Sequence, residues 1–175
     1  MKRVCAHVHS LCLITDSESR YEMLYLKVKE SLSKDHPVIY AAEADANSVI
    51  RKMVNAGIEA ENFIEKGILK IIDAQTAKQL KAQINLESMD PWYQTICKTI
   101  KQAKAKNRLL IICRTEDFEQ AKLLKFEEMV DRGIASLPIE LICCYPTKWL
   151  TKLDLSSIIG ILNAHTLYTE RSLNT

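Results

Sequence analysis

The sequence is poor in glycine and proline, with 4 residues of each among 175. A nucleotide-phosphate loop needs closely spaced glycines, as in G-x-x-x-x-G-K-[ST] or G-x-G-x-x-G, because backbone N–H groups must approach the anion. The glycines here are isolated and fall at the ends of expected helices or inside them: Gly57, Gly67, Gly133 and Gly160. A P-loop NTPase and an ordinary Rossmann enzyme are therefore disfavoured. The G-x-S-x-G elbow of serine hydrolases is missing too.

Long hydrophobic runs are also missing, since none approaches the roughly 18 residues that a membrane-spanning helix needs. The amino-terminal stretch MKRVCAHVHS has too short an apolar segment for a signal peptide. We therefore expect a cytoplasmic protein that does not contact the membrane. The net charge of +2 is too small to indicate a polyanion partner, and the basic stretch 70–108 is typical of a solvated helix face, so no direct nucleic-acid contact is expected.

What is present is the composition of a soluble globular protein, 47% hydrophobic and 26% charged, in a chain that fits one domain over residues 1–175. Short, continuously apolar runs predict strands that are covered on both faces: Leu11–Thr15, Val38–Ala42, Ile68–Asp73, Leu109–Arg114 and Ile139–Tyr145. Helical patterns fall between or after them: 21–32, Asn47–Ala56 ending at Gly57, a short helix within 74–89 followed by a flexible insertion, one from Asp90-Pro91, one from Asp117 to Gly133, and Asp154–Ala164. This alternation predicts a three-layer α/β/α domain with a mainly parallel sheet of five or more strands.

Polar residues follow the expected strands, at the sheet edge where open α/β folds bind ligands. They are Thr15-Asp16, Glu43-Ala-Asp45, Asp73-Ala-Gln75, Arg114-Thr-Glu116-Asp117 and Tyr145-Pro-Thr147. Their grouping predicts a small-molecule site at the carboxyl edge of the sheet.

Six cysteines lie mostly within apolar stretches and are expected to be free thiols in a reducing compartment. A metal site is conceivable if the first and fifth strands are neighbours, because Cys5, His7, His9 and Cys12 would then meet Cys143, Cys144 and His165. However, there is no C-x-x-C pair, and strand alternation points Cys143 and Cys144 to opposite faces. Buried thiols with a hydrogen-bonded histidine are the leading expectation, with structural zinc, a sensory metal and a thiol–imidazole pair left open. No metal, cofactor or catalytic residue is assigned.

Several motifs occur in a fixed order along the chain. They are His9-Ser-Leu-Cys12, Ala56-Gly-Ile58 with Lys66-Gly-Ile-Leu69, Arg114-Thr-Glu116, Phe126-Glu127, Cys143-Cys144-Tyr145 and Leu162-Asn-Ala-His165. In this order the chain resembles the MEDS domain, a sensory domain named from methanogens, methylotrophs and the regulator DcmR. The resemblance spans about residues 5 to 170.

The resemblance implies a RecA/KaiC-like core that has lost its phosphate loop, and a signal-input role for small molecules such as hydrocarbon derivatives. Together with the positions after the strands, it suggests a ligand-binding set: His9, Arg114, Glu116, Cys143, Tyr145 and His165. We expect a non-catalytic sensory domain that binds a small organic ligand at the carboxyl edge and signals through a separate partner such as a kinase or regulator.

Two other function classes stay open. The first is a divergent RecA-like nucleotide-binding protein or a cysteine hydrolase, with Glu116 as base, Arg114 as anion contact, and Cys143 or Cys144 as nucleophile. The second is a protein–protein adaptor, for which a homodimer is the commonest form of self-association.

Overall fold

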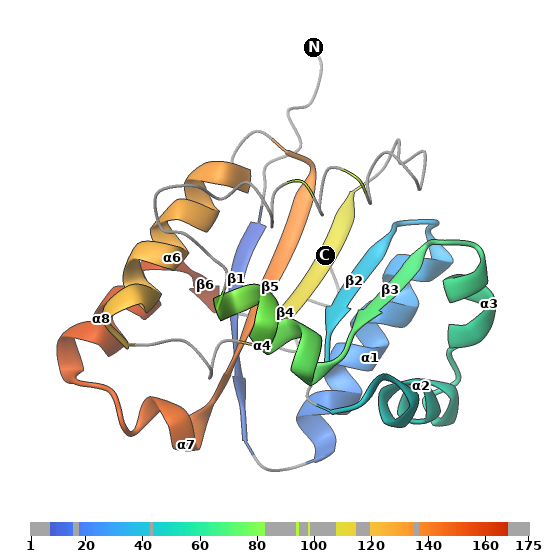
Figure 1. The fold of residues 1–175 in the computed structure, drawn as a ribbon, viewed down its shortest axis with the longest axis horizontal. Coiled ribbons are helices and arrows are strands. Elements are labelled where there is room, and N and C mark those ends of the chain that lie inside the picture. The colour runs from blue at the N-terminus through green and yellow to red at the C-terminus, as the bar shows by residue number, and fades with distance from the viewer. Residues whose placement is uncertain are drawn as a thin grey trace.

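A parallel sheet forms the middle layer of the protein (Figure 1). The structure is a computed structural model that describes residues 8–15, 18–42, 44–82, 94, 98, 108–114, 120–134 and 137–167. Its strands are β1 (Val8–Ile14), β2 (Val38–Ala41), β3 (Leu69–Ile72), β4 (Leu109–Arg114), β5 (Ile139–Pro146) and β6 (Thr166–Leu167). They lie in the order β3-β2-β4-β5-β1-β6, and each paired neighbour is parallel. The predicted strands are confirmed, and the two-residue β6 adds a sixth at the edge.

Helices cover both faces of this sheet, as the alternating pattern predicted. They are α1 (Glu18–Ser33), α2 (Ala46–Asn55), α3 (Ala60–Glu65), α4 (Ala74–Ala82), α6 (Gln120–Ile134), α7 (Thr147–Leu150) and α8 (Leu155–Ala164). The short α3 and α7 were not predicted. The helix expected from Asp90-Pro91 and the start expected at Asp117 lie outside the described residues.

The two sheet faces have separate cores, which explains why the strand residues are apolar without alternation. One core joins α1, α2 and α3 to the face that carries Cys12 and Cys144. The other joins α6 and α8 to the face that carries Leu11 and Cys143. The predicted opposite orientation of Cys143 and Cys144 is confirmed, since each is fully buried in a different core.

Local sequence signals set the ends of several helices. Asp45 caps α2 by accepting a hydrogen bond from the Ser48 backbone N–H at 2.9 Å, and Asp154 does the same for α8. The predicted stop at Gly57 is confirmed, because this residue has a φ of +76°, a left-handed conformation that glycine adopts without steric cost.

Two helices beside the β6 end of the sheet, α6 and α8, lie side by side (Figure 1). A Cβ atom on Gly160 of α8 would lie 2.6 Å from Leu124 Cδ2 of α6, so the missing side chain permits this close approach. The spacing matters because α6 and the end of α8 both supply residues to the site described below.

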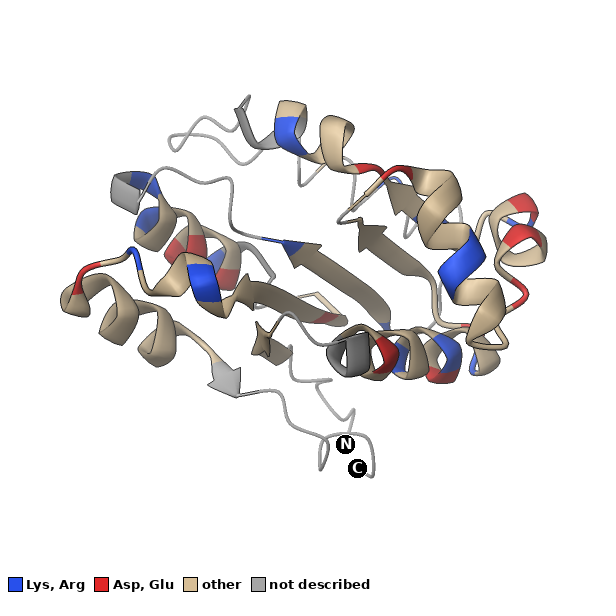
Figure 2. Ribbon diagram, turned by 90° about the horizontal axis from the view of Figure 1, so that it is seen from below, with Lys and Arg blue, Asp and Glu red and all other residues tan. Residues whose placement is uncertain are grey.

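Charged residues of both signs are mixed over the described helices (Figure 2). The basic stretch 70–108 lies largely outside the described residues, so its expected role as a solvated face stays a prediction. Among the helices that the structure describes, none combines the length and apolar character needed to cross a membrane.

Candidate functional site

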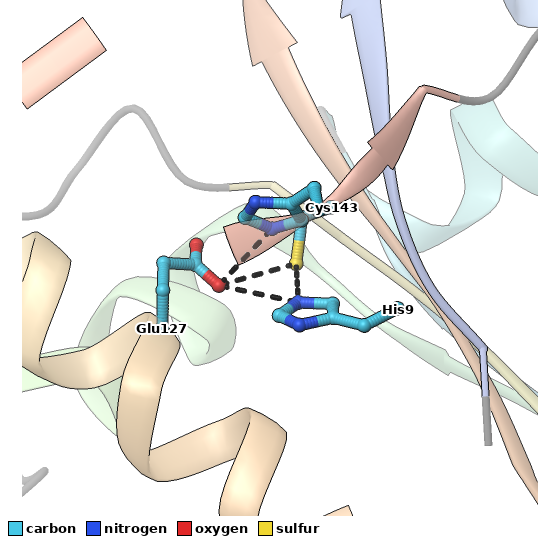
Figure 3. A group of neighbouring side chains, drawn as sticks. His9, Glu127 and Cys143 are labelled. Carbon is cyan, nitrogen blue, oxygen red and sulfur yellow. Dashed lines mark hydrogen bonds and ion pairs between the residues drawn. The ribbon is translucent and has the colours of Figure 1, made fainter. Parts of the chain in front are cut away.

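Polar side chains from distant parts of the chain meet inside the α6/α8 core (Figure 3). They are His9 of β1, Glu127 of α6, Cys143 of β5 and His165, the residue directly after α8. One ligand-type atom from each of the four lies within 4.8 Å of the corresponding atoms of the others. We call these four residues the buried cluster.

The sheet register explains how two of them come together. Strands β1 and β5 are neighbours, and Leu11 pairs with Cys143. His9 lies two positions before Leu11, so it points to the same face as Cys143. The adjacency on which the metal hypothesis depended is therefore present, whereas Cys12 and Cys144 face the opposite core.

Glu127 reaches the cluster because it occupies an apolar position of α6. Leu123, Phe126 and Val130 are buried at helical spacing on the same stripe, and Glu127 is itself 0% exposed. The signal that could have identified Glu127 as a site residue is its charge within an otherwise apolar helical stripe. The sequence interpretation noted the Phe126-Glu127 pair but did not include Glu127 among the site residues.

The Glu127 carboxylate is the hub of the cluster. Its Oε2 atom lies 3.3 Å from His9 Nε2, 3.3 Å from His165 Nε2 and 3.8 Å from Cys143 Sγ. Its other oxygen, Oε1, accepts a short hydrogen bond from the Tyr145 hydroxyl. The carboxylate is thus oriented by Tyr145 on one side and directed at two ring nitrogens and one sulfur on the other.

These contacts keep Glu127 ionised in the core. Burial alone would raise its pKa, but the interactions with His165, His9 and Tyr145 outweigh burial and lower the pKa to about 2. Burial and the Glu127 charge raise the pKa of Tyr145, so its hydroxyl remains a donor. A buried carboxylate that stays charged at neutral pH is unusual outside functional sites or paired ion networks.

Both histidines have an oxygen atom near the ring nitrogen that faces away from the centre. His165 Nδ1 lies 2.7 Å from the Ile161 carbonyl oxygen. His9 Nδ1 lies 3.5 Å from Asp131 Oδ1. The two Nε2 atoms are therefore the ones that point at Glu127.

The cysteines of this region are not set up as nucleophiles. Burial, followed by the contact with Cys113 at 3.4 Å between the sulfur atoms, raises the pKa of the Cys143 thiol. The hydrogen bond with Cys12, together with burial, raises the pKa of Cys144. Since the thiolate is the reactive form, these environments disfavour the cysteine hydrolase alternative.

The predicted ligand-binding set divides between the two faces of the sheet. His9, Cys143, Tyr145 and His165 come together, and the rings of Tyr145 and His165 lie 5.9 Å apart. Arg114 pairs in register with Cys144 and so points to the α1 face. Glu116 lies outside the described residues.

Arg114 instead contacts one of the residues that line a pocket on the α1 face. Its Nη1 donates to the Tyr21 hydroxyl at 2.9 Å, and Tyr21 lines a pocket of about 480 Å³ between α1 and α2. The lining residues are Tyr21, Glu22, Tyr25, Leu26, Lys52, Asn55 and Ala56. Tyr21 and Glu22 belong to the first turns of α1, which follows β1, so this pocket begins near the carboxyl edge of the sheet.

Comparisons with known proteins agree on the fold. The family model described as the MEthanogen/methylotroph, DcmR Sensory domain (MEDS) matches residues 8–166. No curated protein sequence matches the chain significantly.

Solved structures add two relatives in shape from Pyrococcus horikoshii. A KaiC-like protein has a TM-score of 0.56 and 17% identity over 81% of this chain, which spans only 63% of that protein. An uncharacterized protein in complex with an unknown peptide has a TM-score of 0.64 and 14% identity over 90% of this chain and 75% of its own. Identities this low support the shared KaiC-like, RecA-type fold alone.

Proposed function

The chain belongs to the MEDS family of sensory domains, its general role is signal input, and we propose that it binds a small, partly apolar organic ligand in the pocket between α1 and α2. The observation that carries the proposal is the contact from Arg114 to Tyr21, which connects the carboxyl end of β4 to the wall of that pocket. Ligands of open α/β sheets bind near this edge.

The lining of the pocket suits such a ligand. Tyr21, Tyr25 and Leu26 offer aromatic and aliphatic surface, and Lys52 and Glu22 offer charge. Lys52 Nζ lies 5.6 Å from the centre of the Tyr21 ring, so one cation stands over one aromatic wall. A volume of about 480 Å³ falls in the usual range for small-molecule sites.

Sensing requires a ligand that prefers one of two arrangements of the protein. A ligand seated against Tyr21 and Lys52 contacts α1 and α2 together, so it stabilises one relative position of these helices. Arg114, fixed to Tyr21, carries that preference to the end of β4. A partner that reads the α1 face then receives the signal.

A thermal-shift screen with alcohols, amines, halogenated hydrocarbons and magnesium–ATP tests the proposal. A ligand at 100 times its Kd adds about 2.7 kcal/mol, which for a chain of this size raises Tm by about 5 to 11 °C. We expect the shift with an organic ligand, its loss in Lys52→Met and Tyr21→Ala, and its retention in Lys125→Met, an exposed lysine of α6. Stabilisation by magnesium–ATP alone would refute the proposal and favour a nucleotide-binding protein. An equal shift in all variants would move the site elsewhere.

A further inference from the structure

Four of the six separations among the ligand-type atoms of the buried cluster lie at or near those of atoms that share a metal ion, and all six lie within 4.8 Å. In a tetrahedral zinc site, bonds of about 2.0 Å to nitrogen or oxygen and 2.3 Å to sulfur place the ligand atoms about 3.3 to 3.6 Å apart. Here the Nε2 atoms of both histidines lie 3.3 Å from Glu127 Oε2. His9 Nε2 lies 3.4 Å from Cys143 Sγ, and that sulfur is 3.8 Å from Oε2.

The tautomer of His165 provides the second observation. A carbonyl oxygen can only accept, so the 2.7 Å contact with Ile161 requires a proton on Nδ1. When the ring is neutral, this tautomer directs the lone pair of Nε2 at the lone pairs of Glu127 Oε2, 3.3 Å away, whereas a protonated ring would pair with the carboxylate. Among the described residues, this buried Nε2 has no hydrogen bond of normal geometry. In the neutral form, a cation between the two atoms replaces this repulsion with attraction.

The surroundings match the outer shell of a metal site. Histidine ligands usually donate their other ring N–H to a backbone carbonyl or a carboxylate, as His165 does to Ile161 and as Asp131 beside His9 permits. Tyr145 holds Oε1 of Glu127, which leaves Oε2 for the centre. Cys113 Sγ, 3.4 Å from Cys143 Sγ, is placed to support the thiolate.

From this geometry we propose that His9, Glu127, Cys143 and His165 bind one divalent transition-metal ion of the zinc type. Two imidazoles, a thiolate and a carboxylate suit such an ion, whereas Mg²⁺ and Ca²⁺ prefer oxygen ligands alone. A dication with one thiolate and one carboxylate is electrically neutral, which favours burial in this core. All four ligands come from the protein, so the site is closed, as in structural rather than hydrolytic zinc sites.

The ion would join β1, β5, α6 and the end of α8 at one point. Metal binding therefore couples directly to the packing of α6 and α8 on the sheet. This inference concerns the face opposite the α1/α2 pocket and stands or falls independently of the proposed organic ligand.

Metal analysis and cobalt spectroscopy on the full chain test the site. We expect the protein grown with zinc to retain about one ion per chain, and Co²⁺ added to metal-free protein to give the visible bands of tetrahedral coordination and a thiolate charge-transfer band. Cys143→Ser should abolish the charge-transfer band and weaken metal binding by more than tenfold. Changes to outer-shell residues alone cost 10- to 100-fold in metal affinity, so the loss of a direct ligand should cost at least about tenfold. Glu127→Gln should weaken binding comparably without removing that band.

The neighbouring Cys144→Ser is the matched control, because Cys144 is equally buried on the same strand but faces the other core. It should bind like the wild type, and circular dichroism must show that each variant is folded. A folded wild type that binds neither Zn²⁺ nor Co²⁺ would overturn the proposal and leave a metal-free ion pair between Glu127 and a protonated histidine. Full binding in both folded Cys143→Ser and folded Glu127→Gln would overturn it as well.

Discussion

Replacing Glu127 by glutamine should destabilise the metal-free protein by about 3 kcal/mol at pH 7. The lowering of its pKa from the ordinary 4.5 to about 2 is worth that amount at 1.36 kcal/mol per unit. An independent route gives a similar figure, since removing one partner of a buried charged network costs about 3 to 5 kcal/mol. Glutamine keeps the shape of the side chain, so the loss reports on charge rather than on a cavity.

Urea unfolding in the presence of a chelator measures this effect. With a slope of about 2 kcal/mol per molar, the midpoint should fall by about 1.5 M. Trp149 is a convenient fluorescent reporter, because its ring lies 5.9 Å from that of Tyr145. Glu128→Gln on the next residue is the matched control, since its side chain is 65% exposed and faces Arg132. It should change stability by less than about 0.5 kcal/mol.

The stabilising contribution of the Glu127 charge should also depend on pH, in a direction set by its lowered pKa. Because the folded pKa is depressed, the contribution of Glu127 is complete above about pH 4.5 and is lost as pH falls toward 2. The difference between wild type and Glu127→Gln should therefore narrow by about 2 kcal/mol between pH 4.5 and pH 3. The refuting result is a Glu127→Gln variant whose stability at pH 7 falls no further below the wild type than that of Glu128→Gln. Glu127 would then not be the charged hub that the contacts indicate.

Substitutions at three further positions test the helices and turns around the sites. Asp45→Ala should cost about 1 kcal/mol, and Asp45→Asn much less, because only alanine loses the cap on the Ser48 N–H; thermal unfolding of both variants checks this. Gly67 has a φ of +69° with open space around it, so Gly67→Ala should cost about 1 to 2 kcal/mol from backbone strain alone and Gly67→Asn less, again by thermal unfolding. Gly160→Leu should overpack α8 against Leu124, cost about 1 to 3 kcal/mol, and weaken Co²⁺ binding; unchanged cobalt affinity would show that the spacing of α6 and α8 does not control the cluster.

The layers of the fold were predictable because a strand that is buried on both faces is continuously apolar in the sequence. The runs Val38–Ala42 and 109–113 are apolar at every position, and the helix boundaries at Gly57 and Asp154 are marked by a left-handed glycine and a capping aspartate. The short α3 and α7 have too few residues for a periodic pattern to emerge. The strand order was not predicted, because it depends on where each helical connection places the next strand and not on the composition of any single strand.

The site was predictable only in part, for a related reason. Alternation along β5 correctly separated Cys143 from Cys144, but nothing local says that β1 lies beside β5. Arg114 follows a strand, as ligand contacts do, yet the same alternation turns it to the other face. Glu127 was the residue to recognise, because a carboxylate within an apolar helical stripe needs partners that only the folded core supplies.

The two faces of the sheet meet in consecutive residues at the end of β4. Cys113 places its sulfur 3.4 Å from Cys143 of the buried cluster, whereas Arg114 donates to Tyr21 at the pocket. If an organic ligand that shifts Arg114 changes metal affinity at the cluster, linkage requires the metal to change the affinity for that ligand by the same factor. Organic ligand at one face and metal at the other would then bias the same conformational equilibrium of the protein.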